Sequence, residues 1–413
     1  MSEIFSWIAD YAIYLSIPIV SAVVGFGTNW LAVKMMMYPV EFSGLGVLGW
    51  QGVVPASATK MSRILVEQSL GKVISQQELV DRVDARELAE TMHHRMDTLV
   101  QKTVDEVVES AQLWGRFSLS RFMWLSAPEK LKQDIYAKVR AQLPEIMDSI
   151  SEDFRRDFEV LGNINESVIE RLQTKKRLLI DIFLGAAGRE FTFLARSGFY
   201  FGFPLGIPVM FAWHFYPVWW LLPAFGLLVG YLTNELAIYM VQKPLKPKRV
   251  LGMTLQGLFV KRQKEISVYL GQVFAKELLN AELLSKDLLR EPGSVDKIQE
   301  LVYRSISEAY AKFPNLVRPL VVASIGPEEY AKSKEVVAGI VMEELRNPDP
   351  RYYQCIDESL DIANTLGERL GKMPPDEFFG LLHPVIAEDQ WKLVAVGAAL
   401  GLVAGYLQWL FLS

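Results

Sequence analysis

The chain of 413 residues is long enough for two domains of ordinary size. Its residues are 51% hydrophobic, with a mean hydropathy of +0.17, yet 22% are charged, so we expect apolar spans joined to sizeable water-facing parts. The net charge of −5 argues against a nucleic-acid partner, because nucleic-acid binders usually carry a basic face. The single cysteine excludes an intramolecular disulfide framework.

Four apolar stretches reach or approach the roughly 20 residues that a membrane-spanning helix needs. In chain order they cover residues 12–37, 198–216, 218–240 and 393–412. The second contains two prolines and is the least regular, and a turn at Tyr216 and Pro217 would join it to the third as a hairpin across the bilayer. The sequence therefore predicts a first spanning helix (1–37), a helical soluble domain (38–197), a transmembrane hairpin (198–242), a second helical soluble domain (243–391) and a C-terminal spanning helix (392–413).

Basic residues indicate the orientation of these spans. Lys and Arg are absent before Lys34, between Arg196 and Lys243, and after Lys392. These gaps contain the N-terminus, the hairpin turn and the C-terminus, whereas the opposite ends of the spans are rich in basic residues. The positive-inside rule therefore predicts cytoplasmic soluble domains and outside termini. The acidic start of the chain lacks a basic n-region, so no signal peptide is expected.

Between the spans, apolar residues recur at helical spacing, and both soluble domains are expected to be bundles of amphipathic helices. In the second domain the pattern consists of Val295, Ile298, Leu301, Val302 and Ile306. Strand-like alternation is limited to residues 46–54 and 250–259, which we interpret as short hairpins or interfacial loops. Each contains a Gln-Gly pair (Gln51 and Gly52; Gln256 and Gly257), in which a loop-closing hydrogen bond is favoured over ligand contact.

The sequence contains an internal repeat with a constant spacing of 205 positions. VGFGTNWLAVKMMMYP begins at Val24 and VGYLTNELAIYMVQKP at Val229, and further identities follow without a gap. The other two spans share glycines at every fourth position: Gly198, Gly202 and Gly206; Gly397, Gly401 and Gly405. We interpret these glycines as faces for close helix packing, with a lipid or substrate groove as the alternative. The predicted fold is an all-α integral membrane protein with four spans, two helical cytoplasmic domains and a parallel duplication.

The combination of TNWLA near the end of a first span, a YP or KP pair and a QG pair before a helical region resembles the uncharacterised bacterial family named domain of unknown function 445. The resemblance covers essentially the whole chain. It implies a bacterial cytoplasmic (inner) membrane protein and supplies no activity. The second copy departs from the first in one loop, where Val260, Lys261 and Arg262 replace Pro55, Ala56 and Ser57. A basic role of this loop would be confined to the second copy.

Two Thr-Asn pairs, Thr28-Asn29 and Thr233-Asn234, lie at equivalent depths of the first and third spans. An unpaired amide in hydrocarbon costs roughly 2–7 kcal/mol, so both Asn side chains need partners. Interhelical hydrogen bonding is the simpler interpretation, and a polar substrate or ion site is the alternative. Glu235 lies about two helical turns from Lys243. It is therefore either a functional ionisable residue or a solvated group at the headgroup level.

No cofactor, metal or enzymatic activity is expected. His93 and His94 lie near Glu90, but no third ligand has suitable spacing for a metal. The sequence also has no P-loop, dinucleotide fingerprint or nucleophile elbow. The basic residues of 243–249 and 261–264 would border the inner leaflet, where they fix topology and could additionally bind anionic lipid.

Two classes of function follow from these observations. The favoured one is a non-enzymatic membrane scaffold or envelope-associated protein whose helical domains bind a protein partner or the membrane lipids. The other is a transporter or lipid-handling protein with a polar site between the repeats. A carrier with four spans per chain would need to form a homo-oligomer, most simply a homodimer.

Overall fold

A computed structural model describes residues 2–45, 48–83, 93–110, 125–161, 163–250, 253–290, 293–312, 327–380 and 390–412. The described residues are mostly helical, and the chain divides into two compact units. Unit 1 comprises Met1–Val73, Val168–Val273 and Ala363–Ser413, and unit 2 comprises Ile74–Ser167 and Phe274–Ile362. Each unit takes segments from both halves of the chain. Their bounds differ from those of the five predicted segments, since both ends of the first predicted soluble domain lie in unit 1.

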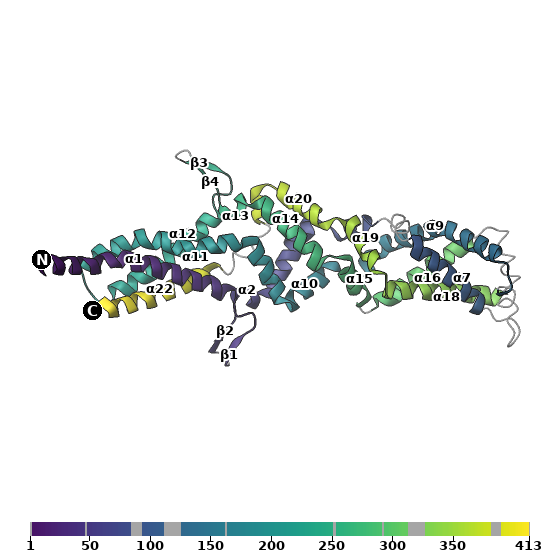
Figure 1. Ribbon diagram of the computed structural model, residues 1–413, viewed down its shortest axis with the longest axis horizontal. Helices are drawn as coiled ribbons and strands as arrows, with labels where there is room; N and C mark the ends of the chain where they lie inside the picture. The colour runs from purple at the N-terminus through teal and green to yellow at the C-terminus, as the bar shows by residue number, and fades with distance from the viewer. Residues whose placement is uncertain are drawn as a thin grey trace. The chain divides into compact units, whose positions relative to one another are not determined.

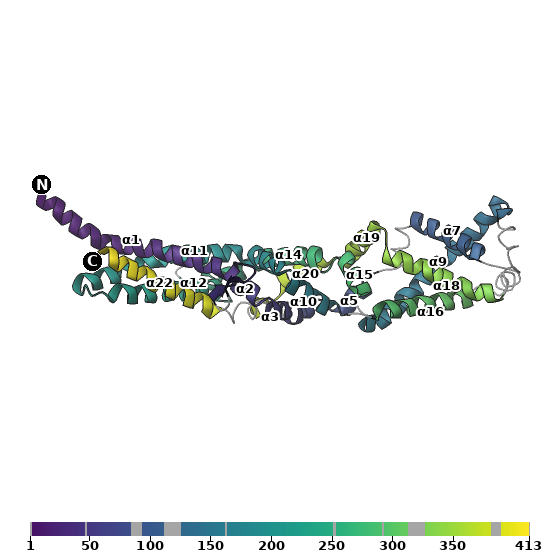
Figure 2. The same ribbon diagram turned by 90° about the horizontal axis from the view of Figure 1, so that it is seen from below.

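Unit 1 contains four long helices that run side by side (Figures 1 and 2). They are α1 (Ser2–Met37), α11 (Lys176–Phe215), α12 (Leu221–Gln242) and α22 (Gln390–Leu412). α1 packs against α11, α12 packs against α22, and α11 also contacts α12. Six buried residues form a core between them: Ile17, Val209, Trp213, Leu221, Leu222 and Val229.

Three described segments are long and apolar enough to cross a membrane: Ser16–Met37, Leu221–Gln242 and Gln390–Phe411. Each has 22 residues, and a helix of that length spans about 33 Å, close to the roughly 30 Å of a hydrocarbon core. α11 is not among these three. It is one continuous helix of 40 residues that contains Pro204 and Pro208, and the predicted second span is its C-terminal part.

A short antiparallel hairpin follows α1, and another follows α12. β1 (Ser43–Leu45) pairs with β2 (Leu48–Trp50), and β3 (Lys248–Val250) pairs with β4 (Met253–Leu255). The two hairpins have the same register at a spacing of 205 positions, and both project from the helices (Figure 1).

The hairpins begin earlier than the predicted strand-like stretches. The end of each stretch is instead a helical turn, α2 (Val53–Ala56) in the first and α13 (Leu258–Lys261) in the second. Val53 and Val54 are both buried, as are Phe259 and Val260. Consecutive side chains of a strand point to opposite faces, so a strand with one covered face would bury only every second residue, and two buried neighbours fit a helical turn better.

Shorter helices continue unit 1 beyond the hairpins. They are α3 (Ala58–Arg63), the π-helical segment η1 (Ile64–Leu70), α4 (Gly71–Val73), α10 (Ile164–Thr174), α14 (Gln263–Val273) and α20 (Ile362–Lys372). The α20 helix is held by Gln263, whose amide nitrogen donates to the carbonyls of Leu370 (2.8 Å) and Met373 (2.9 Å). These carbonyls belong to the helix C-terminus, where no intrahelical donor remains.

Four helices of unit 2 pack around one core: α7 (His93–Ser110), α9 (Glu129–Leu161), α16 (Ser294–Lys312) and α18 (Pro327–Arg346). α7 contacts α9 and α18, and α16 contacts the same two helices, so each half of the chain is packed on the other. The core consists of Ile298, Leu301, Val302, Ile306, Ala338 and Met342. Its α16 members confirm the apolar face predicted from periodicity. The helices α5 (Gln76–Asp81), α15 (Ala281–Arg290) and α19 (Pro350–Leu360) and the π-helical η2 (Phe274–Leu278) complete the described part.

Candidate polar site between the membrane helices

Both Asn side chains of the Thr-Asn pairs are buried in contacts between helices. Asn29 on α1 donates its Nδ2 to the carbonyl of Leu194 on α11 at 3.1 Å, and Asn234 on α12 donates to Leu393 on α22 at 3.2 Å. Each Asn is only 1% exposed. A backbone carbonyl of the neighbouring helix, through its second lone pair, takes the place of water for each amide. The two Asn side chains therefore bond to different helices and not to each other.

The hydroxyl groups of the same pairs are satisfied within their own helices. Thr28 Oγ1 donates to the carbonyl of Gly25 at 3.1 Å, and Thr233 Oγ1 donates to Gly230 at 3.3 Å. Asn29 has two further features. Asn29 Nδ2 is also 3.5 Å from the hydroxyl of Ser197, and its buried Oδ1 has no hydrogen-bond partner among the described residues.

The predicted glycine faces lie where helix backbones touch. A Cβ on Gly198 would overlap the backbone of Gly25, one on Gly202 would lie 2.7 Å from the carbonyl oxygen of Ser21, and one on Gly206 would lie 2.7 Å from Pro18 Cα. In the other helix pair, Gly397 faces Asn234, Gly401 faces Gly226 and Gly405 faces Leu222, each with no room for a Cβ. The absence of side chains thus lets α11 approach α1 and α22 approach α12 at backbone contact.

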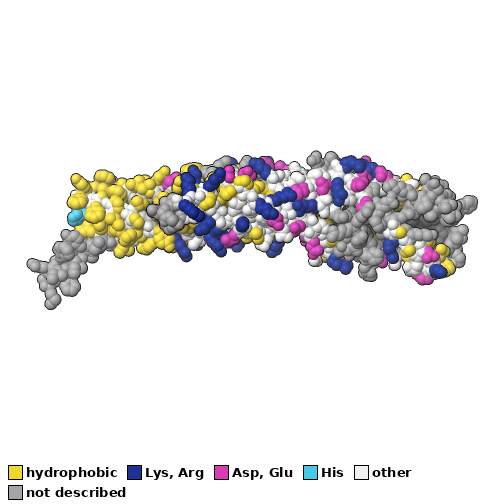
Figure 3. Space-filling view, turned by 90° about the horizontal axis from the view of Figure 1, so that it is seen from above, with side chains coloured by type: hydrophobic (Ala, Val, Ile, Leu, Met, Phe, Trp, Pro, Cys, Tyr) yellow, Lys and Arg dark blue, Asp and Glu magenta, His cyan; other side chains and the backbone are white. Residues whose placement is uncertain are grey.

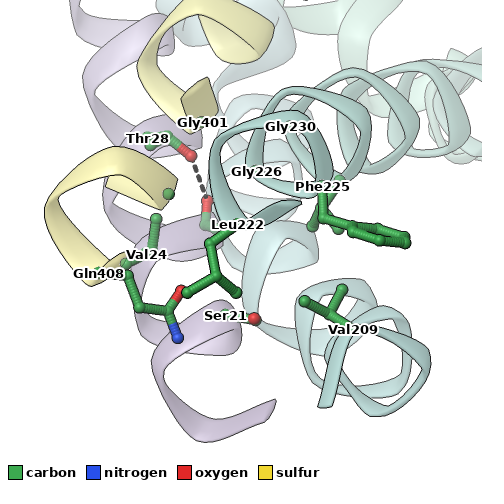
Figure 4. Close-up of a pocket in the computed structure, with 13 residues that line it drawn as sticks. Ser21, Val24, Thr28, Val209, Leu222, Phe225, Gly226, Gly230, Gly401 and Gln408 are labelled. Carbon is green, nitrogen blue, oxygen red and sulfur yellow. Dashed lines mark hydrogen bonds between the residues drawn. The ribbon is translucent and has the colours of Figure 1, made fainter. Parts of the chain in front are cut away.

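A cavity of about 30 Å³ lies between α1, α12 and α22, with Val209 of α11 at its edge (Figure 4). Apolar side chains and glycines supply most of the lining, and the polar members are Ser21, Thr28 and Gln408. The volume has room for about one or two water molecules. Gln408 Nε2 is buried and has no hydrogen-bond partner among the described residues. The cavity lining therefore includes a side chain whose donor group is unsatisfied among the described residues.

Glu235 is not part of this cavity. Its side chain is exposed on α12 and makes no hydrogen bond or ion pair with the described residues. Trp30, at the corresponding position of α1, is 47% exposed, and Lys34 Nζ lies 4.9 Å from the centroid of its ring. Both positions therefore lie on the outward face of their helices.

The two Gln-Gly pairs close the hairpins against the ends of the spans. Gln51 Nε2 donates to the carbonyl of Val40 at 2.7 Å, and Gln256 Nε2 donates to Leu245 at 3.2 Å. The backbone nitrogens of Gly52 and Gly257 donate to Pro39 and Pro244, both at 2.9 Å. A Cβ at either glycine would lie 2.7 Å from the backbone of Met37 or Gln242, respectively. These side chains therefore have a structural role in the turn.

A buried ion pair joins α11 to the loop before α14, and the sequence pattern did not reveal it. Arg262 Nη1 lies 2.8 and 2.7 Å from the two carboxylate oxygens of Glu190, which is 3% exposed. Arg262 also bonds to Glu265 at 3.1 and 3.0 Å. The hydrogen bond from Arg262 lowers the pKa of the Glu265 carboxyl. Lys261 and Arg262 had marked this loop as basic, but no local pattern connects Arg262 to Glu190, 72 positions away.

The metal-site alternative lies outside the described part of the chain. Glu90 is not among the described residues, and neither are the side chains of His93 and His94. Among the described residues, no group of three or more His, Cys, Asp or Glu side chains could hold a metal ion.

Apolar helices of spanning length, packed through glycines and internally bonded amides, define a helical membrane protein. The chain is similar to several bacterial proteins named UPF0754 membrane protein. It is 35% identical over 86 residues to one from Staphylococcus epidermidis, covering 20% of this chain and 23% of the relative. It is 27% identical over 139 residues to one from Exiguobacterium sibiricum, covering 33% of this chain and 31% of the relative. It is 34% identical over 117 residues to one from Shouchella clausii, covering 26% of this chain and 30% of the relative.

The matched segments therefore span about a quarter to a third of the length of these curated relatives. No family model matches the chain, and no solved structure matches it. These relatives are consistent with the expected uncharacterised bacterial family of membrane proteins. They do not test the resemblance to the family named domain of unknown function 445.

Proposed function

We propose that the chain is a four-span protein of the bacterial cytoplasmic membrane that acts as a non-enzymatic scaffold, with its helical soluble parts in the cytoplasm and both termini outside. The soluble helices are available to a protein partner, and the spans to membrane lipids. The main support is that the donor groups of the two Thr-Asn pairs, both hydroxyls and both amide nitrogens, donate to the protein's own helices. A membrane anchor is expected to satisfy its buried donors internally, whereas a carrier needs polar groups that remain free for its substrate.

The C-terminal part of α11 is the proposed fourth span. From Ser197 to Phe215 it contains no Lys, Arg, Asp or Glu. Large apolar side chains are exposed along this segment, for example Phe199, Phe203, Ile207 and Phe211. Exposed side chains of this kind are expected where a helix faces lipid. The helix is antiparallel to α1 and ends at the short turn before α12 (Figure 1).

The proposed duplication is supported by contacts that recur at matching positions. Asn29 with Leu194 corresponds to Asn234 with Leu393, and Gln51 with Val40 corresponds to Gln256 with Leu245. The two hairpins share the same register. Two halves of related sequence that insert alike would produce this recurrence, because equivalent residues then meet equivalent neighbours.

Labelling of single cysteines tests the proposed topology. Cys355 is the only cysteine, so Cys355→Ser gives a background without thiols. We expect Val218→Cys, in the turn between α11 and α12, to react with a membrane-impermeant maleimide in intact cells. Gln133→Cys on α9 and Gln299→Cys on α16, both at exposed positions, should react only after the cells are opened. If Gln133→Cys and Gln299→Cys react from opposite sides of the membrane, the proposal is contradicted.

A transporter or lipid-handling protein is the second candidate, and the cavity beside Gln408 favours it because a buried donor there has no partner among the described residues. Ser21→Cys separates the two candidates, since Ser21 lines the cavity and cysteine is nearly isosteric with serine. A closed scaffold should protect this thiol from a small impermeant thiosulfonate on both sides of sealed vesicles. A carrier should expose it from at least one side, with Val218→Cys as the reactive control.

A further inference from the structure

The segment that follows α12 is strongly basic. Between Glu235 and Glu265 the sequence has seven Lys and Arg and no Asp or Glu. Arg262 is held by Glu190 and Glu265. The other six cations are exposed and make no ion pair with the described residues: Lys243, Lys246, Lys248, Arg249, Lys261 and Lys264. Six exposed cations in one short segment, none of them paired with a described acidic residue, form a surface suited to anions.

The β3–β4 hairpin adds apolar surface to these charges. Lys248 lies directly opposite Leu255 in the register, so their side chains share one face of the hairpin. Leu255 is 45% exposed, and Lys243 is the first residue after α12. Figure 3 shows Lys and Arg side chains gathered beside the apolar end of unit 1. A cation next to an exposed leucine at the end of a span matches the membrane interface, where headgroups and acyl chains meet.

The β1–β2 hairpin provides an internal comparison. At the positions that correspond to Lys243, Lys246, Lys248 and Arg249 it has Tyr38, Glu41, Ser43 and Gly44. Glu41 is itself paired with Lys176 at 2.9 Å. Both hairpins follow a span and have the same register, yet only the second is basic. If these charges only set the topology, they could equally follow either span, so their concentration on one hairpin indicates an additional role.

We propose that the β3–β4 hairpin, together with Lys243, Lys261 and Lys264, is a binding surface for the anionic headgroups of membrane phospholipids. This inference rests on the proposed topology, which places the end of α12 at the cytoplasmic headgroup layer. The lysine and arginine side chains bind the phosphate groups, and Leu255 lies against the acyl-chain boundary. The first hairpin has no such preference for anionic lipid.

Energy transfer to labelled lipids tests the proposal on the full chain. A donor dye is attached at Thr254→Cys, an exposed position of β4, in the Cys355→Ser background. The protein is reconstituted in phosphatidylcholine vesicles with a small fraction of acceptor-labelled phosphatidylglycerol or, separately, phosphatidylcholine. We expect phosphatidylglycerol to be enriched about fivefold or more at this dye, since one cation near an anionic headgroup already gives that factor. A dye at Ser43→Cys on β1 should report equal amounts of both lipids.

Charge variants provide the matched controls. Lys246→Gln, Lys248→Gln and Arg249→Gln together should bring the enrichment close to one. Lys72→Gln, Lys130→Gln and Arg346→Gln remove the same charge at other exposed positions and should leave it unchanged. Equal enrichment at Thr254 and Ser43, or equal loss in both triple variants, would overturn the proposal. So would competition by inorganic phosphate at constant ionic strength, which would indicate a site for the free anion.

Maleimide labelling of the same Thr254→Cys protein separates the two possible failures. If Thr254→Cys reacts from the same side as Val218→Cys, the proposed topology fails and the lipid site fails with it. If the labelling pattern is as proposed but phosphatidylglycerol is not enriched, only the lipid site is wrong.

Discussion

The ion pair between Glu190 and Arg262 is the most buried charged contact that the structure describes in unit 1. Replacing only one member leaves the other charge in a place with little water, which typically costs about 3–5 kcal/mol. We therefore expect Arg262→Gln or Glu190→Gln to lower the free energy of unfolding by about 3 kcal/mol, measured by denaturant titration in mixed micelles.

Two further variants control this expectation. The double variant Glu190→Gln with Arg262→Gln should recover much of the loss, because two amides can bond to each other. Arg189→Gln should change little, since Arg189 is 72% exposed and its pair with Glu265 is solvated. If Arg189→Gln lowers the free energy of unfolding as much as Arg262→Gln does, burial is not the reason for the stabilising effect of the ion pair.

Tyr136 gives unit 2 a dependence on high pH. Its hydroxyl donates to Asp105 at 2.9 Å and joins α9 to α7. Burial, followed by this hydrogen bond, raises the pKa of Tyr136 to about 12. A raised pKa means that the folded state favours the neutral phenol, so its contribution to stability is complete below pH 10 and is lost as the pH rises towards about 12. The midpoints of thermal unfolding of the native chain and of Tyr136→Phe should therefore converge over this pH window. A difference between the midpoints that stays constant would contradict the stabilising role of the Tyr136 hydroxyl.

At the scale of elements, the contact between α1 and α11 depends on the missing side chain of Gly198. A Cβ there would overlap the backbone of Gly25, whereas a Cβ on Gly188 of the same helix meets no atom within 4 Å. We expect Gly198→Ala to destabilise the protein by about 1–3 kcal/mol through forced separation of the helices. Gly188→Ala should stabilise it slightly, because alanine favours helix. The midpoints of thermal unfolding in detergent compare the two, and equal shifts would show that helix propensity outweighs packing.

The elements differ in how far the sequence predicts them. Length and hydropathy locate the three most apolar spans, and the glycine spacing identifies the helix faces that touch. The predicted bounds of the hairpins differ from the observed ones, because sequence alternation alone does not show that the neighbours Val53 and Val54 are both buried. The partner of Asn29 could not be predicted, since the acceptor is the main-chain carbonyl of Leu194 and carries no residue signature. Periodicity likewise predicts the apolar face of α16 but not the helices that cover it, because the spacing of apolar residues within one helix does not show which other helices pack against them.

At the scale of the whole molecule, both compact units are assembled from the two halves of the chain. In unit 2, α9 and α7 of the first half contact α16 and α18 of the second. We therefore expect residues 1–217 and 218–413, expressed as two separate chains, to associate and to co-purify in mild detergent. Each half alone should be degraded, because its apolar faces lack a cover.

Ile306→Asp is the control for this association, since Ile306 is 2% exposed in the core of unit 2. A carboxylate there would oppose packing and reduce the yield of the two-chain complex. Stable isolated halves, or co-purification unaffected by Ile306→Asp, would show that the halves do not depend on each other in this core.

The cross-packing of unit 2 also sets an order of events during synthesis. α7 and α9 leave the ribosome well before α16 and α18 exist, because the long helices α11 and α12 are made in between. At about 5–20 residues per second, the stretch from Leu161 to Arg346 takes on the order of ten to forty seconds. During that interval the nascent chain holds uncovered apolar stripes next to the insertion machinery. A folding helper that shields them there would determine how much of the protein reaches its final form.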